Sequence, residues 1–205
     1  MNPDKEVMQR IQRADSPVAF FGDRIWFSEP LAIGSSTSYF GGELGVSVEP
    51  LTSAQHLRRT LTLDLHHFDV GDPTLNMLPL IFPQTLSGGK MEYDASSGSG
   101  IRITALRGKP SDQWPYANYP SEFPLVPLAF SKPERCTYEQ FIDGLPQAPH
   151  DARDKMVVAL PPTEESGKFG VGVWFPLGED PLAYVWSVFE IDLRERRVKA
   201  YNMCD

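Results

Sequence analysis

The densest group of side chains that could hold a metal ion lies in Asp64-Leu65-His66-His67-Phe68-Asp69-Val70-Gly71-Asp72. Imidazole and carboxylate groups together bind a divalent metal that activates water, so one interpretation is a metal-assisted hydrolase with Asp64, His66 and Asp69 as ligands. Alternation along a strand, however, puts His66 with Asp64 on one face. His67 and Asp69 then lie on the other face, and at most half of the group converges. We favour a polar strand face ending in a turn, without a metal or any other cofactor.

Cys136 is a second candidate for chemistry, because a thiolate paired with a histidine is a strong nucleophile. The two histidines outside the first group are His56 and His150, and both are distant from Cys136 in sequence. No signature of a thiol enzyme surrounds Cys136. A sulfur facing the N-terminus of a following helix would have a lowered pKa. We favour a small buried residue that packs against that helix, and expect Cys136 and Cys204 to be free thiols and not a disulfide.

Other catalytic signatures are missing from the sequence. The Ser87-Gly88-Gly89-Lys90 stretch lacks the spacing of a Walker loop, and the chain has no Gly-x-Ser-x-Gly elbow and no Cys-x-x-Cys pair. We therefore assign no catalytic residue.

An aromatic segment from Trp114 to Pro124 combines large rings, prolines and few charges. Tryptophan and tyrosine dominate the central anchors of protein interfaces, so we predict that this segment contacts a partner protein. One alternative is a loop that folds back and caps the core with its rings, and another is a small-ligand or carbohydrate site that uses Trp114 and Tyr116. The predicted contact residues are Trp114, Tyr116, Tyr119 and Phe123.

The charge balance points to the kind of partner. The formal net charge is −8 and the isoelectric point is near 5.0, which disfavours nucleic acid and anionic membrane surfaces as partners. An acidic protein attracts basic ones, and Glu164 and Glu165 are weaker candidates for that contact.

The pattern of apolar residues and turns predicts a β-rich α+β fold with mainly antiparallel strands. Nineteen prolines and sixteen glycines scattered along the chain imply many short elements. A helix is expected from Pro3 to near Ala14, and capping boxes predict short helices after Thr52 and Thr137. The clearest strand is predicted over Thr60–Val70, half-buried, with Leu61, Leu63 and Leu65 inside. Further strands are predicted at 18–21, 24–27, 44–48, 78–82, 90–93, 101–106, 125–130, 156–160, 169–175, 183–193 and 197–203.

Length and composition favour one domain over residues 1–205, with 41% hydrophobic residues. No apolar run reaches the roughly 20 residues that span a bilayer, and the first residues do not resemble a signal peptide, so we expect a cytoplasmic protein. These observations favour a non-catalytic protein-binding module over an enzyme. Its sharpest form is an immunity-type antitoxin that occludes a toxic enzyme such as a nuclease.

Overall fold

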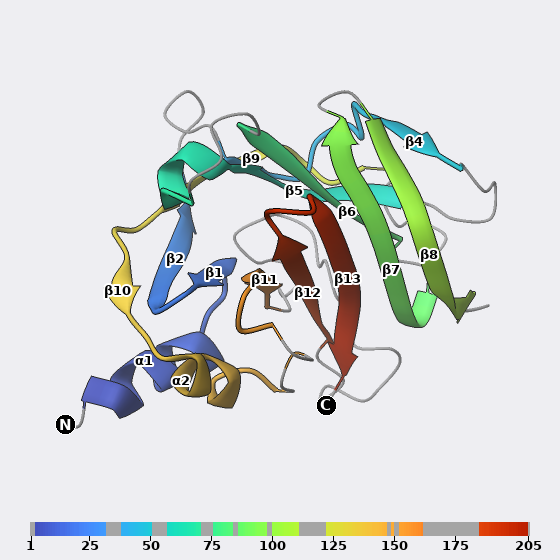
Figure 1. The fold of residues 1–205 in the computed structure, drawn as a ribbon. Coiled ribbons are helices and arrows are strands. Elements are labelled where there is room, and N and C mark those ends of the chain that lie inside the picture. Colours follow the sequence, from blue (N-terminus) through green and yellow to red (C-terminus); the bar gives the residue numbers. More distant parts are fainter. Residues whose placement is uncertain are drawn as a thin grey trace.

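The computed structural model describes residues 3–31, 38–50, 57–70, 76–83, 86–97, 100–110, 122–146, 149, 152–161 and 185–204. These residues form thirteen β-strands, two α-helices and one short 3-10 helix (Figure 1). The predicted class is confirmed: the protein is a β-rich α+β fold whose strands pair antiparallel except for β4 with β8. No helix in the described ranges is long and apolar enough to cross a membrane.

The helices are α1 (Pro3–Gln12), η1 (Leu65–Phe68) and α2 (Tyr138–Asp143). The strands are β1 (Val18–Phe21), β2 (Arg24–Pro30), β3 (Ser38–Phe40), β4 (Ser47–Glu49), β5 (Leu57–Asp64), β6 (Met77–Pro83), β7 (Leu86–Ser97), β8 (Gly100–Pro110), β9 (Val126–Phe130), β10 (Glu134–Arg135), β11 (Met156–Leu160), β12 (Val185–Asp192) and β13 (Arg197–Cys204).

The strands join in the order β4-β8-β7-β13-β12-β11-β1-β2-β9-β3-β5-β6, with β10 beside β2. Strand β2 links two halves, since its first part pairs with β1 and its last three residues pair with β9. The sheet folds over so that β6 lies against β7 and β13 (Figure 1). The larger core cluster lies between the two halves and includes Trp26, Leu61, Phe82, Tyr93 and Phe189.

The two α-helices cover the opposite face of β1, β11 and β12. A smaller apolar cluster lies beneath them and includes Ile11, Phe20, Phe141 and Val188. Burial of these side chains holds the short helices in place, because helices of this length are marginal by themselves. The approach is close enough that a Cβ on Gly144 would lie 2.8 Å from the Cβ of Ile11.

Local sequence signals are confirmed where a few neighbouring residues decide the structure. Thr137 and Gln140 form the predicted capping box, with both reciprocal hydrogen bonds present, and α2 ends at Gly144. The turn at Gly22, with φ of +65°, joins β1 to β2 in the predicted hairpin. The C-terminal hairpin also forms, as β12 and β13.

The predicted strand over Thr60–Val70 is wrong in its second half and in its burial. β5 ends at Asp64, whose carboxylate accepts a hydrogen bond from the backbone N–H of His66 (3.0 Å) and caps η1. An aspartate side chain that accepts a hydrogen bond from the backbone N–H two residues later competes with strand pairing. Here this hydrogen bond ends the strand and begins the helix. Thr60 and Thr62 are buried too, so β5 is covered on both faces.

Two further predictions need adjustment. Leu57 and Arg58 belong to β5, so the short helix predicted near residues 53–58 is wrong at its end, and its earlier part lies outside the described residues. The strand predicted at 44–48 is observed as β4, shifted to Ser47–Glu49. The strand predicted at 169–175 lies outside the described residues.

Candidate functional site

The predicted interface residues fall into two groups. Trp114, Tyr116, Tyr119, Glu164 and Glu165 lie outside the described residues. Phe123 is described, and its side chain is buried and stacks on Phe40 with ring centroids 5.5 Å apart. This ring caps the core, as the alternative interpretation of the aromatic segment expects, and it fixes the C-terminal end of that segment to β3.

Two glycines allow this close approach. The N–H of Gly42 donates to the carbonyl oxygen of Phe123 (2.9 Å). Gly41 has a φ of +70°, and a Cβ there would overlap the carbonyl oxygen of Pro124. Glycine adopts positive φ readily and leaves room for a neighbouring backbone, so Gly41 is suited to the position on both counts.

Leu125 follows directly and points outward. Its side chain is 56% exposed, the largest exposure of any large hydrophobic residue in the described part of the chain. The aromatic segment therefore ends in one buried ring that anchors the backbone and one apolar side chain that faces solvent.

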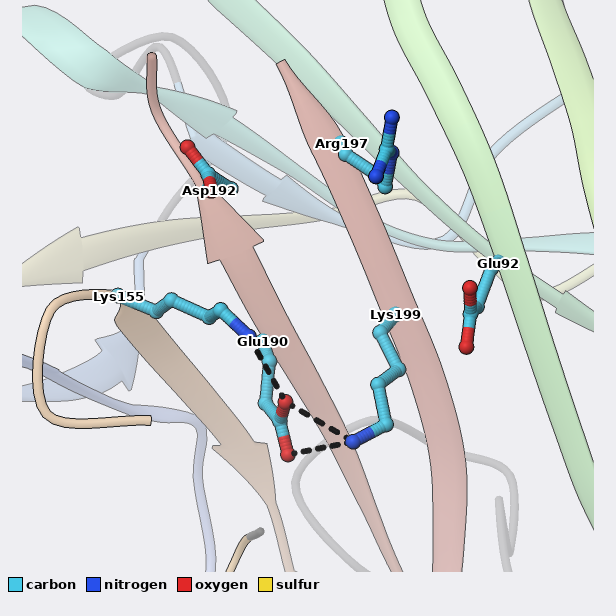
Figure 2. A pocket seen from close by; sticks show the side chains of 6 residues that line it. All are labelled: Glu92, Lys155, Glu190, Asp192, Arg197 and Lys199. Atoms are coloured by element: carbon cyan, nitrogen blue, oxygen red, sulfur yellow. Dashed lines mark hydrogen bonds and ion pairs between the residues drawn. The ribbon is translucent and has the colours of Figure 1, made fainter. Parts of the chain in front are cut away.

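A charged pocket lies on the outer face of the sheet, which we define as the face of β7, β8, β12 and β13 turned away from the larger core cluster. It has a volume of about 190 Å³ (Figure 2). Alternation along β12 places Phe189 and Ile191 in that cluster and Glu190 on the outer face. The lining residues balance in charge and are Glu92, Lys155, Glu190, Asp192, Arg197 and Lys199.

The Glu190 carboxylate is buried in this pocket and is held by several contacts. Its side chain is 0% exposed. Lys199 Nζ lies 3.3 and 3.1 Å from its two oxygens, and the Tyr201 hydroxyl donates to Oε1 (2.7 Å). Lys155 Nζ approaches Oε2 at 3.7 Å. Figure 2 shows both lysine side chains turned toward this carboxylate.

Four contacts from three donor groups occupy the two carboxylate oxygens, which leaves little capacity to accept a further hydrogen bond. The arrangement instead holds two ammonium groups in defined places on the outer face. A buried carboxylate requires such partners, because removal of a charge from water is costly. The pocket is suited to presenting fixed charges.

The described members of the His/Asp group do not converge into a metal site. Among the described residues no three His, Cys, Asp or Glu side chains are placed to hold an ion, and Asp72 lies outside them. His66 and His67 are adjacent in the short helix η1, and the Asp64 carboxylate caps that helix. The expectation that the histidines lie in a strand is wrong, although the two rings have exposed positions in either arrangement.

Cys136 is a buried free thiol, as expected, and the side chain of Cys204 lies outside the described part. Burial, with a smaller contribution from the Glu134 carboxylate, raises the pKa of the Cys136 thiol to about 12. A thiol with a raised pKa is protonated near neutral pH and is a poor nucleophile.

The fold and these sites define a β-rich α+β protein with an anchored aromatic segment and a charged sheet face. No protein-family model matches the chain, and neither a curated protein nor a solved structure matches it significantly.

Proposed function

We propose that this protein is a non-catalytic protein-binding module, and in the sharpest form an immunity-type antitoxin that occludes a basic toxic enzyme such as a nuclease. The observation that carries the proposal is the exposed Leu125, which follows the aromatic segment on a backbone that Phe123 and Gly42 fix. A contact residue on a fixed backbone loses less conformational entropy on binding than one on a loose loop.

Charge supports the same function. The net charge of −8 attracts a basic partner over long range and raises the rate of encounter. The outer face of the sheet adds charges that are already held by partners, such as Lys199 on Glu190. Fixed charges of this kind favour a complementary protein surface and oppose others.

The proposal is tested by co-expression with toxic proteins encoded beside this gene. The wild-type chain is expected to restore growth and to form a stoichiometric complex on size-exclusion chromatography. A Trp114→Ala/Tyr116→Ala variant and a Leu125→Asp variant are expected to lose both effects while keeping the wild-type melting temperature.

Met77→Asn is the control, because Met77 is the other exposed large hydrophobic residue of the described part, at 40%, and a neutral polar side chain there avoids a like charge opposite Asp64. If the Leu125→Asp and Trp114→Ala/Tyr116→Ala variants restored growth fully, the aromatic segment would not be part of the interface. Turnover of a substrate by the purified wild-type chain would contradict the non-catalytic function itself.

A further inference from the structure

Charges alternate in register across the outer face of the sheet. Asp192 on β12 pairs with Arg197 on β13, and Arg197 with Asp94 on β7. Asp94 pairs with Arg102 on β8, and their side chains form an ion pair at 3.5 Å. Opposite charges on neighbouring strands stabilise a sheet, and like charges directly opposite destabilise it.

Strand β4 continues this alternation at the edge. Its last residue, Glu49, pairs with Arg102, while Val48 pairs with Ile101. Val48 and Ile101 are buried in the larger core cluster, so the acidic residue lies on the outer face and the apolar residue faces inward. A strand beside β8 thus places acids opposite arginines and apolar residues toward the core.

Beyond Arg102, β8 has no strand on this side within the described residues. β4 pairs only with Gly100–Arg102, whereas β7 pairs along the other side of β8 as far as Pro110. Figure 1 shows β8 at the margin of the sheet, with β4 near one end of it. An unpaired strand edge presents backbone N–H and C=O groups that another chain can bind.

The far edge of the sheet, by contrast, is partly occupied within the chain. Strand β6 carries Pro79, which has no N–H to offer. The Tyr93 hydroxyl from β7 accepts from the N–H of Ile81 (3.2 Å) and donates to the carbonyl oxygen of Pro79 (3.3 Å). Two backbone groups of this edge are thus satisfied within the chain, whereas no residue that the structure describes covers β8 from Ile103 onward.

The side chains along this open edge are basic and apolar. The stretch from 100 to 110 contains no acidic residue. Arg107 is exposed and pairs with another cation, Lys90 on β7. Ile103 and Leu106 are half-buried and pack against the larger core cluster on the inner face.

We propose that the β8 edge from Ile103 to Gly108 binds an extended segment of a partner protein in which acidic and apolar residues alternate. The segment adds a strand to the sheet, with an acidic residue opposite Arg107 and an apolar residue over Leu106, beyond the bulge that separates Ile103 from Ala105, just as Glu49 and Val48 on β4 lie opposite Arg102 and Ile101. This proposal does not depend on the aromatic segment of the proposed function, and a peptide assay tests it without any toxin.

Charge also disfavours a second copy of this chain as the partner at the β8 edge. Two β8 edges side by side would bring the basic residues of both copies onto one face, with no acidic residue between 100 and 110 to offset them. An acidic segment removes that repulsion and balances the charge of Arg107, which forms no ion pair with any residue that the structure describes.

The test measures binding of a short fluorescent peptide that alternates valine and glutamate, by anisotropy, against a matched peptide that alternates valine and lysine. The wild-type protein is expected to bind the glutamate peptide about tenfold more tightly. Arg107→Glu is expected to reverse that preference. Arg194→Glu, an exposed arginine in the β12–β13 turn, makes the same change in net charge and is expected to leave the preference unchanged.

Backbone pairing is tested with two glutamate peptides, each N-methylated on the residues of one edge. Strand addition requires that one of them binds and the other does not. Equal binding of both, equal effects of the two arginine substitutions, or no binding of any peptide would overturn the proposal. A wild-type dimer that the glutamate peptide fails to dissociate would assign the edge to a second copy and would overturn it as well.

Discussion

The ring of Phe123 stacks on the ring of Phe40, with planes 18° from parallel. This contact joins the end of the aromatic segment to β3 and so to the larger core cluster, in which both rings are fully buried. The C-terminal end of the segment predicted to bind a partner is thereby held by core packing.

Phe123→Ala is expected to lower the free energy of unfolding by about 3–5 kcal/mol, because it removes a buried aromatic ring and leaves a cavity. Urea denaturation followed by tryptophan fluorescence measures the change. Leu125→Ala is the matched control two residues on, and its exposed side chain predicts a change within about 0.5 kcal/mol. Similar effects of both substitutions would place Phe123 outside the core.

Gly41→Ala is expected to destabilise the protein more than Gly22→Ala. Both glycines have positive φ, +70° and +65°, so alanine at either site costs roughly 1–2 kcal/mol in backbone conformation. Only at Gly41 does the added Cβ also meet a neighbouring backbone, that of Pro124, whereas nothing lies within 4 Å at Gly22. The difference between the two melting temperatures measures this close approach, and equal losses would argue against it.

Glu190→Gln is expected to destabilise the protein by about 3 kcal/mol. The substitution keeps the shape of the side chain but removes the charge that Lys155 and Lys199 share, and breaking a buried ion pair leaves its partner uncompensated. Glu92→Gln on the same outer face removes only an exposed pair with Lys90, at 3.9 Å, and should change the stability by less than about 1 kcal/mol. Chemical denaturation distinguishes the two, and a neutral Glu190→Gln would show that the pocket does not depend on this carboxylate.

Cys136 is expected to resist thiol reagents in the native protein. In a Cys204→Ser background Cys136 is the single thiol, and its raised pKa and burial predict labelling at pH 8 at least about a hundredfold slower than in the unfolded chain. Rapid labelling of the native protein at that pH would contradict the buried position.

The raised pKa of the Cys136 thiol also makes the stability of the protein depend on pH. The thiol is neutral in the folded protein up to about pH 12, but ionises in the unfolded chain from roughly pH 8.5. Its contribution to stability is therefore complete below that unfolded pKa and is lost as the pH rises toward the folded one. Cys136→Ala is expected to make the decline between roughly pH 8.5 and 9.5 shallower, where most tyrosines of the unfolded chain are still protonated.

The sequence predicted those parts of the fold in which adjacent residues decide the outcome. Thr137 and Gln140 cap α2 within one turn, and Gly22 supplies the positive φ of the first hairpin. The end of β5 was also readable in principle, because Asp64 can accept from the N–H of His66 and so begin a helical turn. That local signal competes with the clean alternation of Leu61 and Leu63, and the hydrogen bond to Asp64 decides the outcome.

The candidate sites were harder to predict because they depend on strands far apart in the chain. Glu190 and Lys199 face each other across a local hairpin, but Glu92 joins them only because β7 pairs with β13. The opposition of Glu49 and Arg102 depends likewise on a parallel pairing that no turn signal announces. Burial of Phe123 follows from contacts with β3, and residue type alone does not separate an interface ring from a core ring.

The Tyr93 hydroxyl on the edge of β6 also limits how copies of this chain can assemble. A filament built by strand addition needs two available margins on every subunit, one to receive and one to give. Here the phenol of the subunit itself already binds two backbone groups in the middle of one margin, beside a proline that has no N–H, so a strand added there would have to displace Tyr93. Head-to-tail growth through this margin is therefore disfavoured, which opposes polymerisation of a strand-rich chain.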